Sequence, residues 1–168
     1  MANETSRQEV QQIFLKKLRN PLFFKFFLLT KMPIAFLSGL YIRNIDFNSC
    51  TCSVPFKWLT QNPFRSVYFA SQSMAAEMST GALALMKIQG YNPGISMLVL
   101  KVEGIFHKKA TQRIYFTCTE GDAIEQAIQR SVQTGVGVDV EVLTEGRTKD
   151  NILLSTFKIT WTFKPRSK

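Results

Sequence analysis

The sequence predicts an α+β fold in which an antiparallel sheet wraps around one long helix. Residues 66–89 are dominated by Ala, Met and Leu and contain no proline, which is typical of a long buried helix. Segments in which apolar and polar residues alternate lie on both sides of this helix, and such alternation is typical of strands. Because a long apolar helix amid antiparallel strands is characteristic of α+β domains, the expected order is helices, two strands, one long helix and four strands.

Two helices are expected before the first strand. Ser6 and Glu9 match a capping box, in which two side chains satisfy free backbone amides reciprocally, and apolar residues follow at helical spacing. The pair Asn20 and Pro21 ends this helix and starts a second one that reaches about Thr30.

Two strands precede the long helix and four follow it. The first two are expected at residues 40–47 and 50–54, and an irregular segment then leads into the helix. Residues 122–132 are expected to form a helix or a broken loop. The four later strands are expected at residues 97–105, 111–119, 136–142 and 153–163.

Residues 21–40 are the most apolar part of the chain. Lys25, Lys31 and Pro33 interrupt this segment, so it does not reach the ~18 uninterrupted apolar residues of a membrane-spanning helix. Its phenylalanines are expected to pack on their own domain or across a dimer interface. Contact with a membrane surface, through Phe side chains flanked by Lys, is the alternative.

Composition and length point to one basic domain. The 168 residues show no repeat and no linker, so residues 1–168 are expected to form a single domain. The net charge of +9 is spread along the chain without a run of five bases, which argues against nucleic acid as a partner and leaves a general preference for anions. Three Cys and one His lack the spacing of a zinc site, so no metal is expected. The odd Cys count, in strand-like contexts, favours buried thiols and a cytoplasmic location.

Glu77 is the single acidic residue between Asp46 and Glu103, and it lies in the middle of the long helix. At about 100° per residue, its neighbours on that face of the helix are apolar or small. A buried carboxylate needs partners or its pKa rises, and a pKa near the working pH suits a general base. The alternative is a Glu that reaches the helix flank and pairs with an Arg or a backbone group.

Asn62 precedes the helix in the irregular segment, where an Asn is by default a turn or capping residue. The first turn of the helix also leaves backbone amides without partners, and such amides can bind an oxyanion. An Asn, free amides and an internal Glu along one segment are the parts of a hydrolytic site.

This pattern is similar to that of the hotdog-fold acyl-thioester hydrolases, particularly the phenylacetyl-CoA thioesterase type, and it looks closest to a bacterial branch of that superfamily. In these thioesterases the motif reads Asn, five residues, His-Gly-Gly, and an Asp or Glu nine positions after the His. This chain has Asn62, five residues, Tyr68-Phe69-Ala70, and Glu77 nine positions after Tyr68.

The resemblance implies a role for each matching position. Glu77 would be the general base or nucleophile, and Asn62 would orient water or the thioester carbonyl. The amides of Phe69 and Ala70 would bind the oxyanion. The Tyr-Phe-Ala sequence departs from His-Gly-Gly. Gly permits a close approach of the backbone to a ligand, and the side chains of Phe69 and Ala70 restrict that approach, so whether the site turns over substrate is a separate question from whether it binds one.

The substrate implied by the resemblance is an acyl-CoA or acyl-carrier thioester, with coenzyme A as part of the substrate and no separate cofactor. Tyr68, Ser73 and Arg65 are the expected substrate-binding residues. Coenzyme A carries phosphates, which exposed bases at a pocket mouth would bind. The basic candidates on expected loops are Arg65, Lys108, Lys109, Arg147 and Lys149.

The resemblance covers roughly residues 33–164 as a hotdog core, and the two helices of residues 1–31 look like an elaboration of it. Hotdog domains generally dimerise by joining their sheets and share active sites between subunits, so a homodimer or a dimer of dimers is implied. Two functions remain open: a thioesterase, and a non-catalytic module that holds an acyl chain or acyl-CoA.

Overall fold

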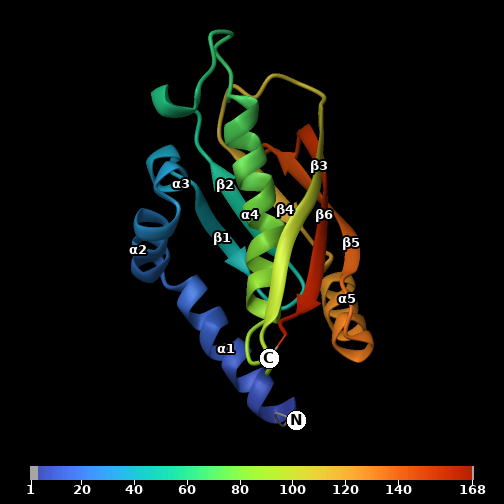
Figure 1. The fold of residues 1–168 in the computed structure, drawn as a ribbon. Coiled ribbons are helices and arrows are strands. Elements are labelled where there is room, and N and C mark those ends of the chain that lie inside the picture. The colour runs from blue at the N-terminus through green and yellow to red at the C-terminus, as the bar shows by residue number, and fades with distance from the viewer. Residues whose placement is uncertain (1–3, 168) are drawn as a thin grey trace.

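The computed structural model describes residues 4–167, and within them six strands form one antiparallel sheet in the order β1-β2-β4-β5-β6-β3 (Figure 1). The strands are β1 (Tyr41–Ile45), β2 (Cys50–Val54), β3 (Ile95–Phe106), β4 (Ile114–Cys118), β5 (Val138–Arg147) and β6 (Leu153–Pro165). The helices are α1 (Glu4–Arg19), α2 (Pro21–Lys31), α3 (Pro33–Ser38), α4 (Phe69–Lys87) and α5 (Gly121–Thr134), with a 3-10 turn η1 at Trp58–Thr60. The predicted α+β class and six-stranded antiparallel sheet are confirmed.

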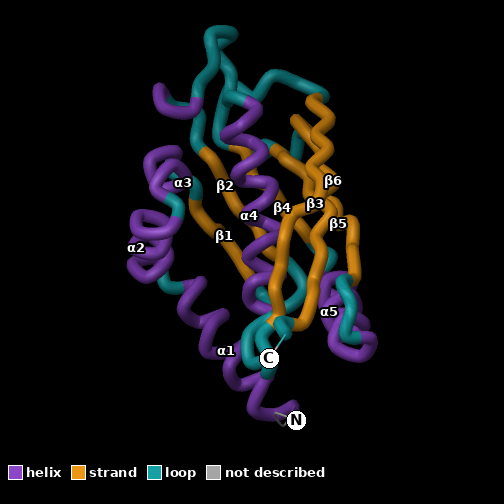
Figure 2. Tube along the Cα trace, in the orientation of Figure 1, coloured by secondary structure: helices purple, strands orange, loops and turns teal. Residues whose placement is uncertain are grey.

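Helix α4 runs along one face of the sheet and contacts β2, β3, β4, β5 and β6 (Figure 1). The helices α1, α2 and α3 lie together beside β1, whereas β3 forms the opposite edge of the sheet (Figure 2). Within residues 4–167 the two edges therefore differ, because one is flanked by helices and the other is a strand without a further strand beside it.

The N-terminal segment holds three helices within the described residues, not the two that the sequence predicted. Asn20 starts α2 as expected, because its Oδ1 accepts hydrogen bonds from the amides of Leu22 and Phe23. The unexpected α3 runs from Pro33 to Ser38 and is capped by Gly39, whose φ of +74° is the left-handed conformation that favours glycine.

The predicted capping box at Ser6 and Glu9 is wrong. Helix α1 already includes Glu4, so Ser6 lies inside the helix and not at its N-cap. The segment predicted as either a helix or a broken loop is the helix α5, because its apolar residues Ile124, Ala127 and Ile128 share one buried face.

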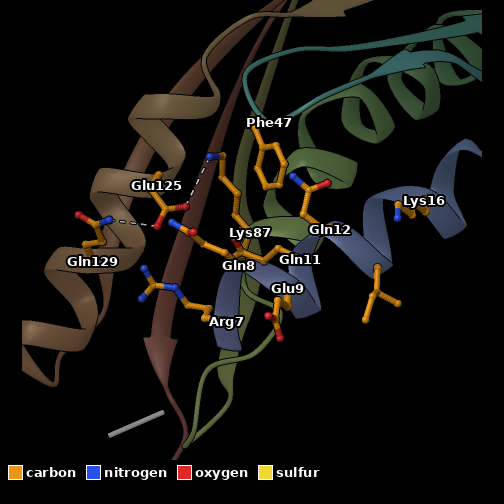
Figure 3. A pocket seen from close by; sticks show the side chains of 11 residues that line it. Arg7, Gln8, Glu9, Gln11, Gln12, Lys16, Phe47, Lys87, Glu125 and Gln129 are labelled. Carbon is orange, nitrogen blue, oxygen red and sulfur yellow. Dashed lines mark hydrogen bonds and ion pairs between the residues drawn. The ribbon is translucent and has the colours of Figure 1, made fainter. Parts of the chain in front are cut away.

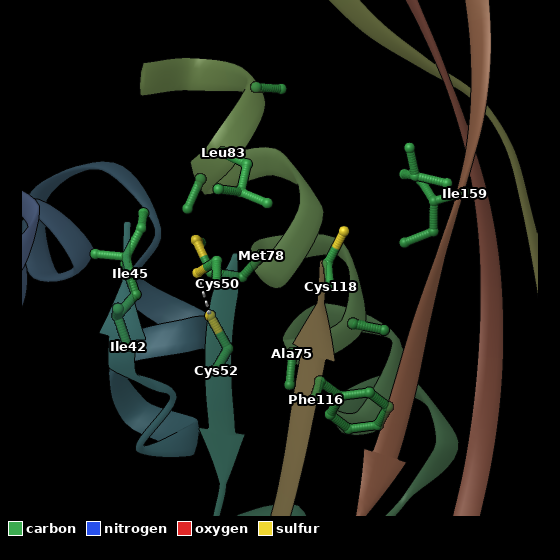
Figure 4. Packing of buried hydrophobic residues seen from close by; sticks show 14 of the residues in the cluster. Ile42, Ile45, Cys50, Cys52, Ala75, Met78, Leu83, Phe116, Cys118 and Ile159 are labelled. Carbon is green, nitrogen blue, oxygen red and sulfur yellow. Dashed lines mark hydrogen bonds between the residues drawn. The ribbon is translucent and has the colours of Figure 1, made fainter. Parts of the chain in front are cut away.

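The three cysteines lie in the hydrophobic core between α4 and the sheet, as Figure 4 shows. All three are buried free thiols, which confirms the sequence prediction. Cys50 and Cys118 are direct partners on the neighbouring strands β2 and β4. Burial raises the pKa of Cys118 to about 12, so this thiol stays protonated and behaves as a small apolar side chain.

None of the helices within residues 4–167 combines the length and the hydropathy that crossing a membrane requires. This agrees with the interruption of the apolar segment by Lys25, Lys31 and Pro33.

Candidate active site

Glu77 is half-buried in the middle of α4 and lines a cavity of about 120 Å³. Apolar side chains from three other elements surround it, among them Leu18 of α1, Phe24 and Phe27 of α2 and Met97 of β3. Burial in this setting raises the pKa of Glu77 from 4.5 to about 7, as the sequence predicted. The carboxyl group therefore exchanges its proton near neutral pH, which is the property of a general base.

The Glu77 carboxylate has no hydrogen-bond donor and no cation as a partner among the described residues. The alternative was a Glu that reaches the helix flank and pairs with an Arg or a backbone group. Within residues 4–167 the Glu77 carboxylate makes no such pair, so this alternative is wrong there. An unpaired carboxylate keeps all of its acceptor capacity for water or a ligand.

Gly81 provides the space that the Glu77 carboxylate occupies. A Cβ atom at position 81 would lie 2.8 Å from Glu77 Oε1 and 3.1 Å from the ring of Trp161. Glycine inside a helix costs roughly 1 kcal/mol relative to alanine, so this position needs a packing reason. The close approach of these two side chains is that reason.

Three other polar side chains along α4, those of Gln72, Ser79 and Thr80, are paired with the sheet. Ser155 Oγ donates to Gln72 Oε1 at 2.9 Å, and the hydroxyl groups of Ser79 and Thr144 lie 2.8 Å apart. At the residue after Ser79, the indole nitrogen of Trp161 donates to Thr80 Oγ1 at 2.9 Å. These buried groups satisfy one another and fix the position of α4 on the sheet.

Asn62 holds together the turn that leads into α4. Its Oδ1 accepts hydrogen bonds from the amides of Phe64 and Ser66 at 3.0 and 3.1 Å and from the Ser66 hydroxyl at 3.2 Å. The backbone amide of Arg65, which has a φ of +58°, donates to the Asn62 carbonyl. The Oδ1 atom of Asn62 thus stabilises the turn, while its Nδ2 atom donates no hydrogen bond among the described residues.

The first turn of α4 presents free backbone amides. Tyr68 is the N-cap residue and its side chain makes no capping hydrogen bond. In the described part of the chain, no acceptor takes the amide hydrogens of Phe69, Ala70 or Ser71. Ser73 Oγ, one turn later, donates to the Phe69 carbonyl at 3.0 Å. The expected oxyanion-binding amides are therefore available.

A second cavity, of about 540 Å³, lies where the Asn62 turn and the start of α4 meet the end of β3. It brings together the predicted residues Asn62, Tyr68 and Phe69. Two of the predicted basic residues, Lys108 and Lys109, also line it. Ala70, Ser73 and Arg65 are not among the residues that line either this cavity or the Glu77 cavity.

Two residues of this second cavity were not predicted as site residues. His107 lines the cavity, and its Nε2 lies 3.0 Å from Thr156 Oγ1. Gln72 also lines the cavity, and the sequence gives no signal for it because its partner Ser155 is far away in the chain.

The structure does not bring all predicted catalytic residues of one chain together. Glu77 and the amide of Ala70 are on the same helix and stand roughly 10 Å apart along its axis, at ~1.5 Å per residue. Glu77 lines the smaller cavity, whereas Phe69, the residue before Ala70, lines the second one. Arg147, a predicted phosphate-binding residue, is already paired with Glu145 at 3.0 Å.

A larger cavity of about 750 Å³ lies between α1, the end of α4 and α5 (Figure 3). Its buried cation, Lys87, lies 3.5 Å from Glu125, which also accepts a hydrogen bond from Gln129 at 3.1 Å. Lys87, the buried cation of this cavity, has a carboxylate partner, whereas the Glu77 carboxylate has no cation beside it among the described residues.

A family model described as a domain of unknown function, DUF4442, matches residues 21–163. The chain belongs to the DUF4442 family. The match begins at α2 and so includes two of the helices that precede the sheet of this DUF4442 protein. No curated protein matches the sequence.

Several solved structures share the fold of this DUF4442 chain. A probable thioesterase from Pseudomonas aeruginosa has a TM-score of 0.74 at 15% identity, over 88% of this chain and 97% of that protein. A second thioesterase from the same organism has a TM-score of 0.62 at 14% identity, over 90% and 94% of the two chains. A thioesterase from Haemophilus influenzae has a TM-score of 0.57 at 12% identity, over 82% and 86%. At such identities the similarity is one of fold.

Proposed function

We propose that this protein is a hotdog-fold thioesterase that hydrolyses acyl-CoA or acyl-carrier thioesters. The observation that carries the proposal is Glu77, an unpaired carboxylate with a pKa of about 7 inside an apolar cavity. Structural stability gives no reason to keep such a group, because an unpaired buried carboxylate is unfavourable. A catalytic base provides that reason.

The proposed reaction uses only groups of the protein, the thioester and water. Ionised Glu77 removes a proton from water, and the oxygen of that water attacks the thioester carbonyl carbon. Negative charge then moves to the carbonyl oxygen, where the free amides of Phe69 and Ala70 donate hydrogen bonds to it. The intermediate collapses, the C–S bond breaks, and the thiolate takes the proton back from Glu77. Direct attack by Glu77 on the carbonyl carbon is the variant of this route that forms an anhydride.

We infer that the site is shared between two copies of the chain, because the two halves stand roughly 10 Å apart in one copy. A two-fold axis that passes near Ser73 would place α4 of one copy antiparallel to α4 of the other. Glu77 and Phe69 each lie four positions from Ser73, so Glu77 of one copy would then face the first turn of its partner's helix.

The open edge of the sheet supports this dimer. Strand β3 pairs with β6 on one side and has no strand on its other side within the described residues. Leu98, Leu100, Val102 and Ile105 on this strand are exposed apolar side chains. An unprotected apolar edge strand is a template for pairing with another chain, and a second copy would join the two sheets.

The carrier end of the substrate fits the second cavity. Lys108 and Lys109 supply positive charge for phosphate groups, and the free Nδ2 of Asn62 can donate to the thioester carbonyl or to water. Arg65 lies on the same turn as Asn62. Phenylacetyl-CoA is the first substrate to assay, because the Glu77 cavity is lined by Phe24 and Phe27 and suits an aromatic acyl group. The free thiols fit a cytoplasmic location.

Thioesterases of similar fold support the pairing of Asn62 with Glu77. Two solved structures of one Staphylococcus aureus thioesterase carry substitutions of a Gln and of a Glu that stand fifteen positions apart. Asn62 and Glu77 are also fifteen positions apart.

The decisive experiment is to measure release of free CoA from phenylacetyl-CoA and from longer acyl-CoAs. We expect Glu77→Gln to reduce kcat by about 100-fold to 10,000-fold, since Gln cannot accept the proton. Wild-type kcat should rise with pH around pH 7, following the pKa of Glu77. Glu141→Gln is the matched control, because Glu141 is exposed and pairs with Lys158 at the surface. Light scattering on the same samples should show a dimer.

Equal activity of wild type and Glu77→Gln would remove Glu77 from the mechanism. The non-catalytic function has its own support, because Phe69 and Ala70 carry side chains at the turn that would bind the oxyanion. In that case acyl-CoA should raise the melting temperature of the wild-type protein while no CoA is released.

A further inference from the structure

The elements α2, α3 and η1 carry exposed large apolar side chains that do not belong to the core. Their exposed fractions range from 50% for Leu29 to 80% for Trp58. Contiguous apolar surface of this kind marks a contact site for a lipid or a protein. The apolar ridge is defined as Leu22, Phe26, Ile34, Leu37, Trp58 and Leu59.

The three elements of the apolar ridge adjoin one another. Helix α3 follows α2 directly in the chain, and Lys57 Nζ donates to the Leu37 carbonyl at 2.8 Å, which ties η1 to α3. All three lie on the side of the molecule away from β3 (Figure 1). The ridge is therefore separate from the edge proposed for the dimer.

Helix α2 is firmly packed, so its exposed apolar face is not a displaced part of the core. Phe24 and Leu28 form its inner face and are each only 1% exposed. Leu22, Phe26 and Leu29 follow the spacing i, i+4, i+7 and form an outer face. The helix thus buries one apolar face and presents a second one to the surroundings.

The charge around the apolar ridge is of one sign. Residues 10–45 and 47–76 contain no acidic residue, and seven of the twelve acids lie instead in residues 119–150. Lys25 lies within the outer face of α2, Lys31 ends that helix, and Lys57 precedes Trp58. Exposed aromatic side chains combined with flanking lysines are the composition of a surface that binds anionic membranes.

We propose that the apolar ridge docks this protein on the surface of an anionic phospholipid bilayer. Phe26 and Trp58 enter the boundary between headgroups and acyl chains, while Lys25 and Lys31 contact lipid phosphates. A second copy of this surface is a poor occupant, because like charges would meet across the interface. The proposal is independent of the thioesterase proposal, since vesicle binding is measured without turnover.

The two tryptophans of the chain provide a built-in probe. Trp58 is 80% exposed, whereas Trp161 is 4% exposed and donates its hydrogen bond to Thr80. With vesicles of phosphatidylglycerol and phosphatidylcholine in equal parts, the emission of Trp58 should shift to shorter wavelength and be quenched by brominated acyl chains. The Trp58→Phe variant should lose both signals, because the remaining Trp161 stays in the core.

Two sets of variants separate the apolar and the electrostatic contributions in co-sedimentation of the full chain with these vesicles. Phe26→Ser combined with Trp58→Ser should weaken binding by roughly tenfold per side chain. Lys25→Gln and Lys31→Gln should each weaken it roughly fivefold and reduce its dependence on salt. The matched control is Val136→Ser with Ile152→Ser, two exposed apolar residues outside the ridge, which should bind like wild type.

Thermal unfolding of each variant checks that the fold is kept. The proposal is overturned if wild type does not bind the anionic vesicles, or if the control variant loses binding as strongly as the ridge variants. It is also overturned if the ridge variants bind vesicles normally but dissociate an oligomer in light scattering, since the ridge would then hold a second copy.

Discussion

On the side of α4 that faces the strands, Gln72, Ser79 and Thr80 each have a hydrogen-bond partner on the sheet. On the side that faces α1 and α2, Glu77 has none among the described residues. The residues compared on the two sides lie within about two turns of the same helix. The paired side chains fix the position of the helix on the sheet. The unpaired Glu77 carboxylate can instead accept hydrogen bonds from water or a ligand.

The difference shows which side chains stability explains. A buried hydrogen-bonded pair is close to neutral or favourable, whereas an unpaired buried carboxylate and a glycine in the next turn each cost free energy. Glu77 and Gly81 combine two such costs at one place on α4. A catalytic role of the carboxylate would explain why both costs occur at one place. Substitutions at Glu77 and Gly81 should therefore affect activity, whereas substitutions on the paired side of α4 should affect stability.

After the loss of activity expected for Glu77→Gln, the largest effect is expected at Gly81. In Gly81→Ala the new methyl group would lie 2.8 Å from Glu77 Oε1, at the far end of a flexible side chain, so the carboxylate must move. A displacement of about 1 Å in a catalytic group can cost about 100-fold in rate, and we expect kcat to fall by roughly tenfold to 100-fold. Steady-state release of CoA measures this change.

The control is a double-mutant cycle with Glu77→Gln. If Gly81 acts by positioning the carboxylate, Gly81→Ala should have little further effect on kcat in the Glu77→Gln background. An equal loss in both backgrounds would mean that Gly81 acts through packing against Trp161 and not through Glu77.

The next effect is on stability and its dependence on pH. Because the folded-state pKa of Glu77 is about 7, above the usual 4.5, the folded protein binds this proton more tightly than the unfolded chain does. The favourable contribution is fully present below about pH 4.5 and is lost as the pH rises through 7. Glu77→Gln should therefore increase the free energy of unfolding at pH 8 by about 1–3 kcal/mol and change it little at pH 4.

Urea denaturation of wild type and Glu77→Gln at the two pH values measures this difference. Glu141→Gln, at an exposed ion pair, should show no comparable gain at pH 8. A loss of stability at pH 8 in Glu77→Gln would mean that the ionised carboxylate has a favourable partner in solution.

The sequence predicted the fold well where local patterns decide it. The alternation of residues 50–54 gave β2 with its correct ends, and the helix signals placed α4 to within three residues. Strand β5 was cut short because its pattern changes: Thr144 is buried and Leu143 points outward, the reverse of what their polarity suggests. The hydroxyl group of Thr144, which faces inward, has the hydroxyl group of Ser79 as its hydrogen-bond partner.

The candidate site divides in the same way. Glu77 could be found from the sequence, because one acid on an apolar helix face is a local signal. The placing of Gln72 against Ser155, and of Lys108 and Lys109 beside Asn62, depends on contacts between distant parts of the chain. The separation of Glu77 from the first-turn amides in one copy depends on helix geometry, and whether a second copy closes that gap is tested by the dimer measurement.

The smallest effect is expected on the paired side of α4. Thr80→Val keeps the shape of the side chain but removes the acceptor of the Trp161 indole, which is buried. Leaving a buried donor unsatisfied costs about 1–2 kcal/mol, so the free energy of unfolding should fall by that amount at pH 4 and at pH 8 alike. Thr30→Val, an exposed helical position, should change it by less than about 0.5 kcal/mol. A pH-dependent loss in Thr80→Val, or a shift in the pH profile of kcat, would show that the paired side of α4 also controls the proton on Glu77, and the contrast between the two sides would then fail.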